Sequence, residues 1–221
     1  GQKGWDTGIS RDLNAKYKAY KKEKRQEPSP QELCKMLADS EIEAIDKLRT
    51  QYQQEIAQGK MTEVGMQEQL LALAQTIQDM HITIAGKAEL RAHLPSETAD
   101  TEQQTLILTN SYASYMKALF ASANVPYDGI IFADRDIRHV RQKDRFGHSI
   151  EQTKGEYLAE YVNKISKQHP TAQIHVKYRD DEPSHCDDVG DTLSPLVVAS
   201  KNRLSVDVQQ CTFGNPNEPA S

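Results

Sequence analysis

The sequence predicts an α/β protein in which a parallel sheet follows a helical first third. Residues 104–111 form a short apolar run that ends in Thr109, Asn110 and Ser111, and an amphipathic segment at 112–124 follows at once. Short apolar runs then alternate with helical patterns of roughly 10–15 residues, which is typical of parallel strands joined by crossover helices. The first third shows helical periodicity alone.

The helical first third is predicted to contain a lysine-rich helix followed by a helical hairpin. The first helix of the hairpin begins at Ser29, because Ser29, Pro30 and Glu32 can supply an N-cap, a first-turn proline and a capping box. Gly59 is expected to end this helix. Thr62 can cap the next one, so that two long antiparallel helices are joined by a short turn.

Beyond residue 81 the predicted elements become shorter. In chain order they are a helix at 87–94, a strand at 105–108, a helix at 112–124, a strand at 129–132, a charged loop at 134–151, a helix at 153–169, and strands at 172–178, 195–199 and 204–208. This pattern predicts an α-helical cap at residues 1–81, an α/β core at 82–214 and a flexible tail at 215–221.

Composition and charge limit the classes of function. The 221 residues carry a net charge of −5, which argues against non-specific binding of nucleic acid. We interpret the basic run at 16–25 as a solvated helix face. No apolar run approaches the roughly 18 residues of a membrane span. Three widely spaced cysteines suggest neither a disulfide framework nor a zinc cluster, which fits a reducing compartment such as the cytoplasm.

Polar residues stand at three places where successive elements of the predicted core meet. The first is the tip at 109–111, the second is Lys154 at a helix start, and the third is the pair Asp180 and Asp181 after a strand. Because parallel strands bring such tips to one edge of a sheet, we expect these residues to lie close together. A hydroxyl or amide, a lysine and two carboxylates suit a phosphate together with Mg²⁺.

In this order, the motifs resemble those of the haloacid dehalogenase (HAD) superfamily of phosphohydrolases. Residues 106–111 (LILTNS) look like its second motif, whose Ser or Thr holds the phosphate. Residues 153–156 (TKGE) look like the third, whose Lys steadies phosphate and nucleophile, and 176–181 (VKYRDD) look like the fourth, whose acidic pair helps hold Mg²⁺. The helices before 85–90 (AGKAEL) look like a cap inserted after the first strand. The resemblance covers roughly residues 82–191.

The resemblance implies a Rossmannoid parallel sheet with helices on both faces and an α-helical cap that closes over the site. It also implies Mg²⁺-dependent hydrolysis of a phosphomonoester through an aspartyl-phosphate, on a phosphorylated small molecule or a phosphoprotein. The implied roles are catalytic for Thr109 and Lys154, substrate-binding for Thr109, Asn110, Ser111 and Lys154, and metal-binding for Asp180 and Asp181.

The chain departs from the family at the first motif, D-x-D-x-T/V, which supplies the nucleophile and is not found. The acidic residues at 134–136 follow a strand but lie between the second and third motifs, so their place in the chain order is wrong. Three explanations stay open: the first strand precedes Gly1 in the natural protein, a later strand such as 196–199 takes its place, or the protein is a catalytically inactive HAD-like scaffold that acts by binding.

Each singled-out residue also has a purely structural interpretation. Thr109 can serve as a cap for the helix that follows it. Lys154 can be an exposed lysine at a helix start, although the helix dipole disfavours a cation there, and residues 180–181 can form a solvated turn. His185 and Cys186 lie close by, but without a second Cys or His pair at suitable spacing they do not predict zinc.

Overall fold

The structure is a computed structural model that describes residues 8–92, 106–109, 111–125, 130–133, 140–143, 145–147, 149–212 and 215–219. Over these residues the chain is an α/β protein with six helices. Its contacts divide it into an N-terminal unit, Gly1–Asp136, and a C-terminal unit, Ile137–Ser221. None of the helices in the described ranges combines the length and the apolar character that crossing a membrane requires.

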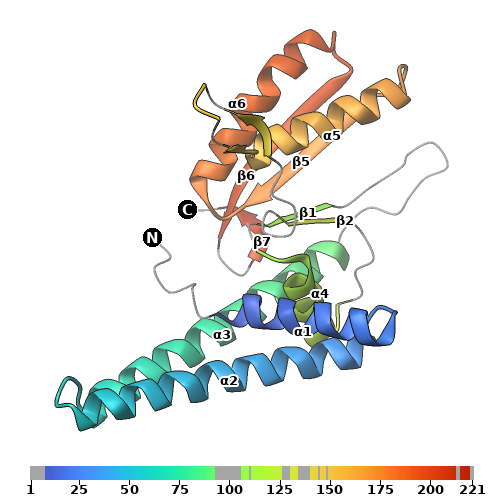
Figure 1. Cartoon of the computed structure of the whole chain (residues 1–221). Helices are drawn as coiled ribbons and strands as arrows, with labels where there is room; N and C mark the ends of the chain where they lie inside the picture. The colour runs from blue at the N-terminus through green and yellow to red at the C-terminus, as the bar shows by residue number, and fades with distance from the viewer. Residues whose placement is uncertain are drawn as a thin grey trace. The chain divides into compact units, whose positions relative to one another are not determined.

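Over its described part, the N-terminal unit combines four helices with one pair of parallel strands, and these are labelled in Figure 1. In chain order they are α1 (Ile9–Lys24), α2 (Pro30–Ala57), α3 (Glu63–Ala92), β1 (Leu106–Thr109), α4 (Ala113–Ser122) and β2 (Ile130–Ala133). β1 and β2 are parallel, and Leu106 stands opposite Ile130. The predicted strand–helix–strand unit is therefore confirmed.

The predicted ends of the helical hairpin are also confirmed. The Ser29 hydroxyl accepts a hydrogen bond from the Glu32 amide, and the Glu32 carboxylate accepts one from the Ser29 amide, each at 3.2 Å. Gly59 follows α2 with a φ of 72°, a left-handed conformation that glycine adopts at little cost. The Thr62 hydroxyl then accepts from the amide of Gly65 at 3.0 Å, which caps α3.

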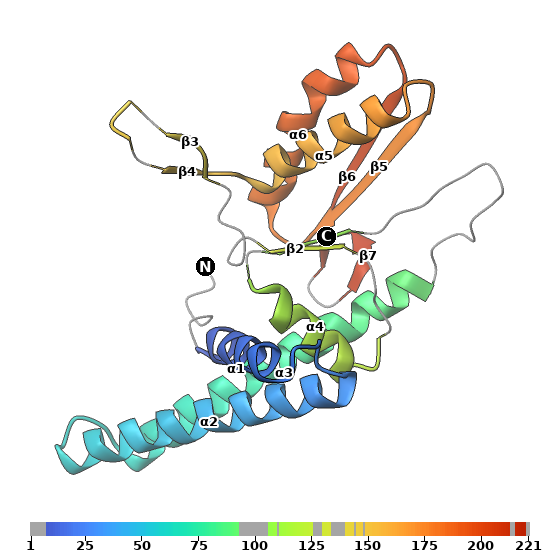
Figure 2. The ribbon, with the colours of Figure 1, turned by 45° about the vertical axis from the view of Figure 1, so that its right-hand side comes forward.

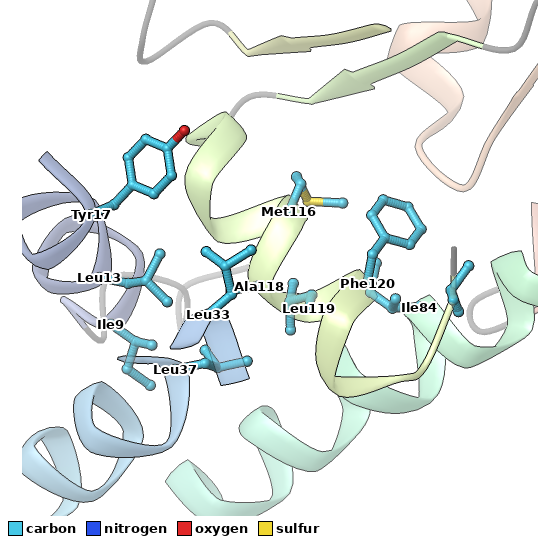
Figure 3. Packing of buried hydrophobic residues seen from close by; sticks show 11 residues of the cluster. Ile9, Leu13, Tyr17, Leu33, Leu37, Ile84, Met116, Ala118, Leu119 and Phe120 are labelled. Carbon is cyan, nitrogen blue, oxygen red and sulfur yellow. The ribbon is translucent and has the colours of Figure 1, made fainter. Parts of the chain in front are cut away.

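Helix α4 lies at the centre of the hydrophobic core of this unit (Figure 3). Ala118 and Leu119 are both 0% exposed, and they pack among residues of α1, α2 and α3. The buried polar groups are paired as well: the Ser114 hydroxyl donates to Asn14 Oδ1 at 2.9 Å. The strand–helix stretch and the helices expected to form a separate cap thus share one core.

The division of the chain differs from the predicted one for this reason. The boundary expected between residues 81 and 82 falls inside α3, which continues without a break to Ala92 and takes in the described part of the separate helix expected at 87–94. Ile84, which lies beyond that boundary, is 1% exposed and belongs to the shared core. Apolar periodicity shows where a helix is amphipathic, but it does not show which partner its apolar face will meet.

A histidine–glutamate pair links the two helices of the hairpin and gives the N-terminal unit a pH dependence. His81 Nε2 on α3 lies 3.0 Å from Glu41 Oε1 on α2. This hydrogen bond raises the pKa of His81, against the opposing effect of burial. Because the folded pKa lies above the unfolded one, the pair stabilises the fold below the unfolded pKa of about 6.5 and stops doing so as the pH rises through the folded pKa.

We therefore expect His81→Gln to lower the free energy of unfolding near pH 6 by a few tenths to about 1 kcal/mol, since the pair is partly exposed. The difference between His81→Gln and the parent chain should shrink as the pH rises above about 7. Chemical denaturation at a series of pH values measures this. Glu41→Gln should remove the same pH dependence, and a difference that is constant from pH 5.5 to 8.5 would contradict the assignment.

In its described residues the C-terminal unit contains two helices and five strands, which can be followed in Figure 2. In chain order they are β3 (Val140–Lys143), β4 (Ser149–Glu151), α5 (Lys154–Gln168), β5 (Ile174–Asp180), α6 (Pro183–Ala199), β6 (Leu204–Thr212) and β7 (Asn215–Pro219). β3 and β4 form an antiparallel pair, β5 and β6 run parallel, and β7 is antiparallel to β6.

Three sequence predictions for this unit are wrong. The strand expected at 195–199 is the last part of α6, so residues 196–199 do not supply a replacement for a missing strand. Short apolar runs are ambiguous between strand and helix, and here the buried Val189 and Leu193 set a helical face while Val198 is exposed. The charged loop expected at 134–151 includes β3 and β4, and the tail expected at 215–221 includes β7.

The strands β5 and β6 have one covered and one exposed face. Leu204 and Tyr178 are buried on the side where α6 packs, and α5 packs against α6. The alternating residues on the other face, such as His175, Lys177 and Asp207, are exposed. In the described part of this unit the helices therefore cover one face of the sheet, and the expectation of helices on both faces is not met there.

Candidate functional site

The structure brings together two of the residues that the sequence singled out, Lys154 and Asp180. Asp180 is the last residue of β5, and Lys154 is the first residue of α5. Lys154 Nζ lies 3.0 Å from Asp180 Oδ2, and the two side chains are only 14% and 10% exposed. A lysine at the start of one helix and an aspartate at the end of a strand thus form a largely buried ion pair.

Three more groups surround the Asp180 carboxylate. The Tyr178 hydroxyl donates to Oδ2 at 2.6 Å, the Glu182 amide donates to Oδ1 at 2.9 Å, and His185 Nδ1 lies 3.4 Å from Oδ2. Burial acts to raise the pKa of Asp180, but the Lys154 ammonium and these hydrogen bonds outweigh it and hold the pKa well below its usual range. Asp180 is therefore ionised at neutral pH.

The same contacts fix the protonation of Tyr178. Burial, followed by the hydrogen bond to the Asp180 carboxylate, raises the pKa of Tyr178 far above its ordinary value. The phenol therefore stays protonated and acts as a hydrogen-bond donor at every physiological pH.

Lys154 has donor capacity beyond this pair. Besides Asp180, its ammonium contacts His185 Nδ1 at 3.2 Å. An ammonium group has three donors, and these two contacts account for two of them. The third is able to meet an oxygen atom of an anionic ligand.

The backbone at the start of α5 is already occupied by an internal anion. The Asp188 carboxylate of α6 accepts from the Gly155 amide at 2.7 Å and from the Thr153 hydroxyl at 3.1 Å. The Thr153 hydroxyl also accepts from the Glu156 amide at 3.1 Å, which confirms that Thr153 caps the helix. The amides of Gly155 and Glu156 are therefore not available to bind a phosphate at the N-terminus of α5. Lys154 is the group at this helix start that could still bind one.

The structure separates Asp181 from this cluster. Asp181 is exposed, whereas Asp180 is largely buried. The Asp181 backbone carbonyl accepts a hydrogen bond from Gln210 Nε2 at 3.3 Å. Neighbouring residues in a strand or at its end point in alternating directions, so the two carboxylates of an Asp–Asp pair need not converge.

The donor set of the described residues does not by itself fit a magnesium site. Both oxygens of Asp180 already contact hydrogen-bond donors, and one faces the Lys154 ammonium, whose positive charge would oppose a cation. Nowhere in the described ranges do three or more His, Cys, Asp or Glu side chains gather as a metal-binding group. His185 and Cys186 are therefore not part of such a group either. Magnesium binding by Asp180 and Asp181 stays a prediction.

The phosphate tip predicted at 109–111 lies in the other unit. Thr109 ends β1, and its hydroxyl accepts from the Ser111 amide at 3.2 Å. Tyr112, rather than Thr109, is the N-cap of α4, and it makes no side-chain capping bond. Asn110 lies outside the described residues. Thr109 and Ser111 therefore belong to the N-terminal unit and Lys154 to the C-terminal unit, and the predicted convergence of all three tips stays a prediction.

An open depression of about 790 Å³ lies elsewhere in the C-terminal unit. Residues of α5, among them Glu156, Lys164 and Lys167, line it together with Thr192 of α6. Neither Lys154 nor Asp180 lines this depression. The ion pair is the better candidate for chemistry because it is buried and charged.

Sequence reasoning missed three residues of this site. Tyr178 could have been found, because it stands two residues before Asp180 in a strand and therefore on the same face. His185 and Asp188 reach the start of α5 from α6, and only the packing of the two helices brings them there.

Comparisons of the chain with protein-family models, with curated proteins and with solved structures find no match.

Proposed function

We propose that the chain is part of a phosphohydrolase of the HAD type, in which Lys154 binds a phosphoryl oxygen of a phosphomonoester. The observation that carries this proposal is the buried contact of Lys154 with Asp180 at the carboxyl end of a parallel strand. A lysine held there, with two of its three donors engaged by partners among the described residues, supplies a fixed positive charge for a phosphoryl group. Phosphoryl transfer relies mainly on such positioning and charge stabilisation.

In the proposed reaction an aspartate from outside the 221 residues attacks the phosphorus atom. A bond forms between its carboxylate oxygen and phosphorus, the phosphorus–oxygen bond of the ester breaks, and the leaving alkoxide takes up a proton. Water then hydrolyses the aspartyl-phosphate to phosphate. Lys154 would stabilise negative charge on the phosphoryl oxygens, while Asp180, Tyr178 and His185 hold its ammonium in place.

We expect Lys154→Ala to lower kcat/KM for a generic aryl phosphate by roughly 10²–10³-fold, the usual effect of removing one preorganised charge-stabilising group. The assay uses the complete natural protein, with and without Mg²⁺, so that it also tests the magnesium prediction. Lys164→Ala, an exposed lysine on the same helix, is the matched control and should leave the rate unchanged. Activity that survives both Lys154→Ala and Asp181→Ala would rule out these site residues.

The alternative function is that of a catalytically inactive HAD-like scaffold that acts by binding. The ion pair between Lys154 and Asp180 favours this scaffold function, because the two charges neutralise each other and stabilise the fold without any ligand. The reading frame upstream of Gly1 discriminates between the two functions: an apolar strand ending in D-x-D there favours the enzyme. If the natural protein has no such motif and shows no aryl phosphatase activity, the scaffold function stands.

A further inference from the structure

One carboxylate of α6 holds the start of α5 from outside the helix. Asp188 accepts a hydrogen bond from the Gly155 amide at 2.7 Å and another from the Thr153 hydroxyl at 3.1 Å. These two residues are the chain neighbours of Lys154, so a single carboxylate holds the chain on both sides of the lysine. The helix does not need Asp188 as its cap, because the Thr153 hydroxyl already accepts from the Glu156 amide.

The same face of α6 holds the other end of the lysine. His185 lies three residues before Asp188, and residues three apart on an α-helix are neighbours on one face. His185 Nδ1 contacts the Lys154 ammonium at 3.2 Å, while that ammonium also meets the Asp180 carboxylate at 3.0 Å. One face of α6 therefore contacts both the ammonium of Lys154 and the residues on either side of it.

Asp188 has little freedom to turn away from the start of α5. Its side chain is partly buried, and the Thr192 hydroxyl, one turn further along α6, lies 3.4 Å from its Oδ1. At Gly155 the two helices approach so closely that a Cβ atom there would lie 2.8 Å from Asp188 Oδ2. The carboxylate is therefore a fixed anchor for the first turn of α5.

The negative charge of Asp188 also suits its place. The first turn of an α-helix carries partial positive charge, which disfavours a cation such as Lys154 and favours an anion. The Asp188 carboxylate reaches this turn from the neighbouring helix and lies against its amides. It therefore offsets the unfavourable effect of the helix dipole on the ammonium of Lys154.

We propose that Asp188 is a positioning residue, which holds the start of α5 so that the Lys154 ammonium stays in place for an anionic ligand. Asp188 acts through Lys154, and it touches neither the substrate nor the reacting atoms. Its effect on catalysis rests on the proposed phosphohydrolase function, whereas the position of the ammonium can be measured without any activity.

Nuclear magnetic resonance tests the position of the ammonium. Ammonium protons held by hydrogen bonds exchange slowly with water, so Lys154 should give a resolved ammonium signal that is absent from Lys154→Arg. Asp188→Ala should speed up the exchange of these protons by roughly tenfold or more, because the ammonium then leaves its partners part of the time. Asp187→Ala removes an exposed carboxylate from the adjacent position and is the matched control, for which the exchange should be unchanged.

A more conservative variant separates positioning from loss of structure. Asp188→Asn keeps an acceptor for the Gly155 amide and loses the charge, so it should keep the fold and give an exchange rate between those of the parent chain and Asp188→Ala. The absence of a resolved Lys154 signal in the parent chain would overturn the proposal. So would parent-like exchange in both Asp188→Asn and Asp188→Ala, or equal effects of Asp188→Ala and Asp187→Ala.

Kinetics of the complete natural protein with an aryl phosphate test the effect on catalysis. Asp188→Ala should lower kcat by roughly 10–100-fold and change KM by no more than about threefold, because a displaced ammonium is missed mainly where charge develops in the transition state. Asp188→Asn should recover part of kcat, and Asp187→Ala should match the parent. A parent protein without phosphatase activity would refute the proposed function, and the resonance experiment then decides the positioning. An active parent whose Asp188→Ala variant keeps its full kcat would overturn the positioning role.

Discussion

Replacing Asp180 by alanine is expected to destabilise the C-terminal unit by about 3 kcal/mol at pH 7. The substitution leaves the Lys154 ammonium, 14% exposed, without its carboxylate, and breaking a buried ion pair from one side costs about 3–5 kcal/mol. The lower end applies because both side chains keep some contact with solvent. The Tyr178 hydroxyl and the Glu182 amide lose an acceptor in the same step.

The loss should depend on pH in a defined direction. The folded pKa of Asp180 lies below the unfolded value of about 3.9, so its contribution to stability is complete above that value and disappears as the pH falls through the folded pKa. The difference between the parent chain and Asp180→Ala should therefore be constant from pH 6 to 8 and shrink below about pH 4. Hydrogen exchange of the α5 and α6 amides measures the stability of this unit at each pH.

Two further variants separate the ion pair from other effects. Asp181→Ala removes an exposed carboxylate at the next position and should change stability by no more than about 0.5 kcal/mol. Lys154→Met combined with Asp180→Leu removes both charges and should recover most of the loss, because apolar side chains can replace a buried ion pair. If Asp181→Ala is as damaging as Asp180→Ala, the buried pair is not the cause.

The second large effect is expected at Gly155, where α5 packs closely against α6. A Cβ atom at this position would lie 2.7 Å from the backbone carbonyl of Asp188 and 2.7 Å from Thr192 Oγ1. A backbone carbonyl within a helix cannot move aside without shifting that helix. Gly155→Ala should therefore cost about 1–3 kcal/mol, the usual cost of overpacking, and weaken the Asp188 bond to the start of α5.

Gly190→Ala is the matched control for this prediction. Gly190 lies in α6, and a Cβ there would meet nothing within 4 Å. Alanine inside a helix is favoured over glycine by about 0.8–1 kcal/mol, so this variant should be more stable than the parent chain. Chemical denaturation followed by circular dichroism compares the two variants. A loss of stability in both, or in neither, would contradict the close approach at Gly155.

The result at Gly155 also bears on the motif at 153–156. In the sequence, Lys154 and Gly155 together resemble a phosphate-site pattern. In the structure Gly155 has a packing role, because only a residue without a side chain lets α6 bring Asp188 to the helix start. Lys154 alone is left to carry the functional interpretation.

Local sequence was sufficient to determine most of the elements of this protein and several of their ends. Ser29, Gly59, Thr62 and Thr153 act within three or four residues of themselves, so their capping and turn chemistry is readable from the chain. The contact between Lys154 and Asp180 was anticipated as well, because strand ends and helix starts of an α/β unit meet at one edge.

Only the tertiary structure decided which elements share a core and which charges meet. α4 is buried among α1, α2 and α3, although its sequence reads as a crossover helix of a separate core. The apolar run at 195–199 continues α6, whose Val189 and Leu193 are fully buried. Tyr178, His185 and Asp188 converge on the start of α5 through contacts between residues far apart in the chain. Such contacts depend on how the apolar faces pack, and the spacing of residues along the sequence does not encode that choice.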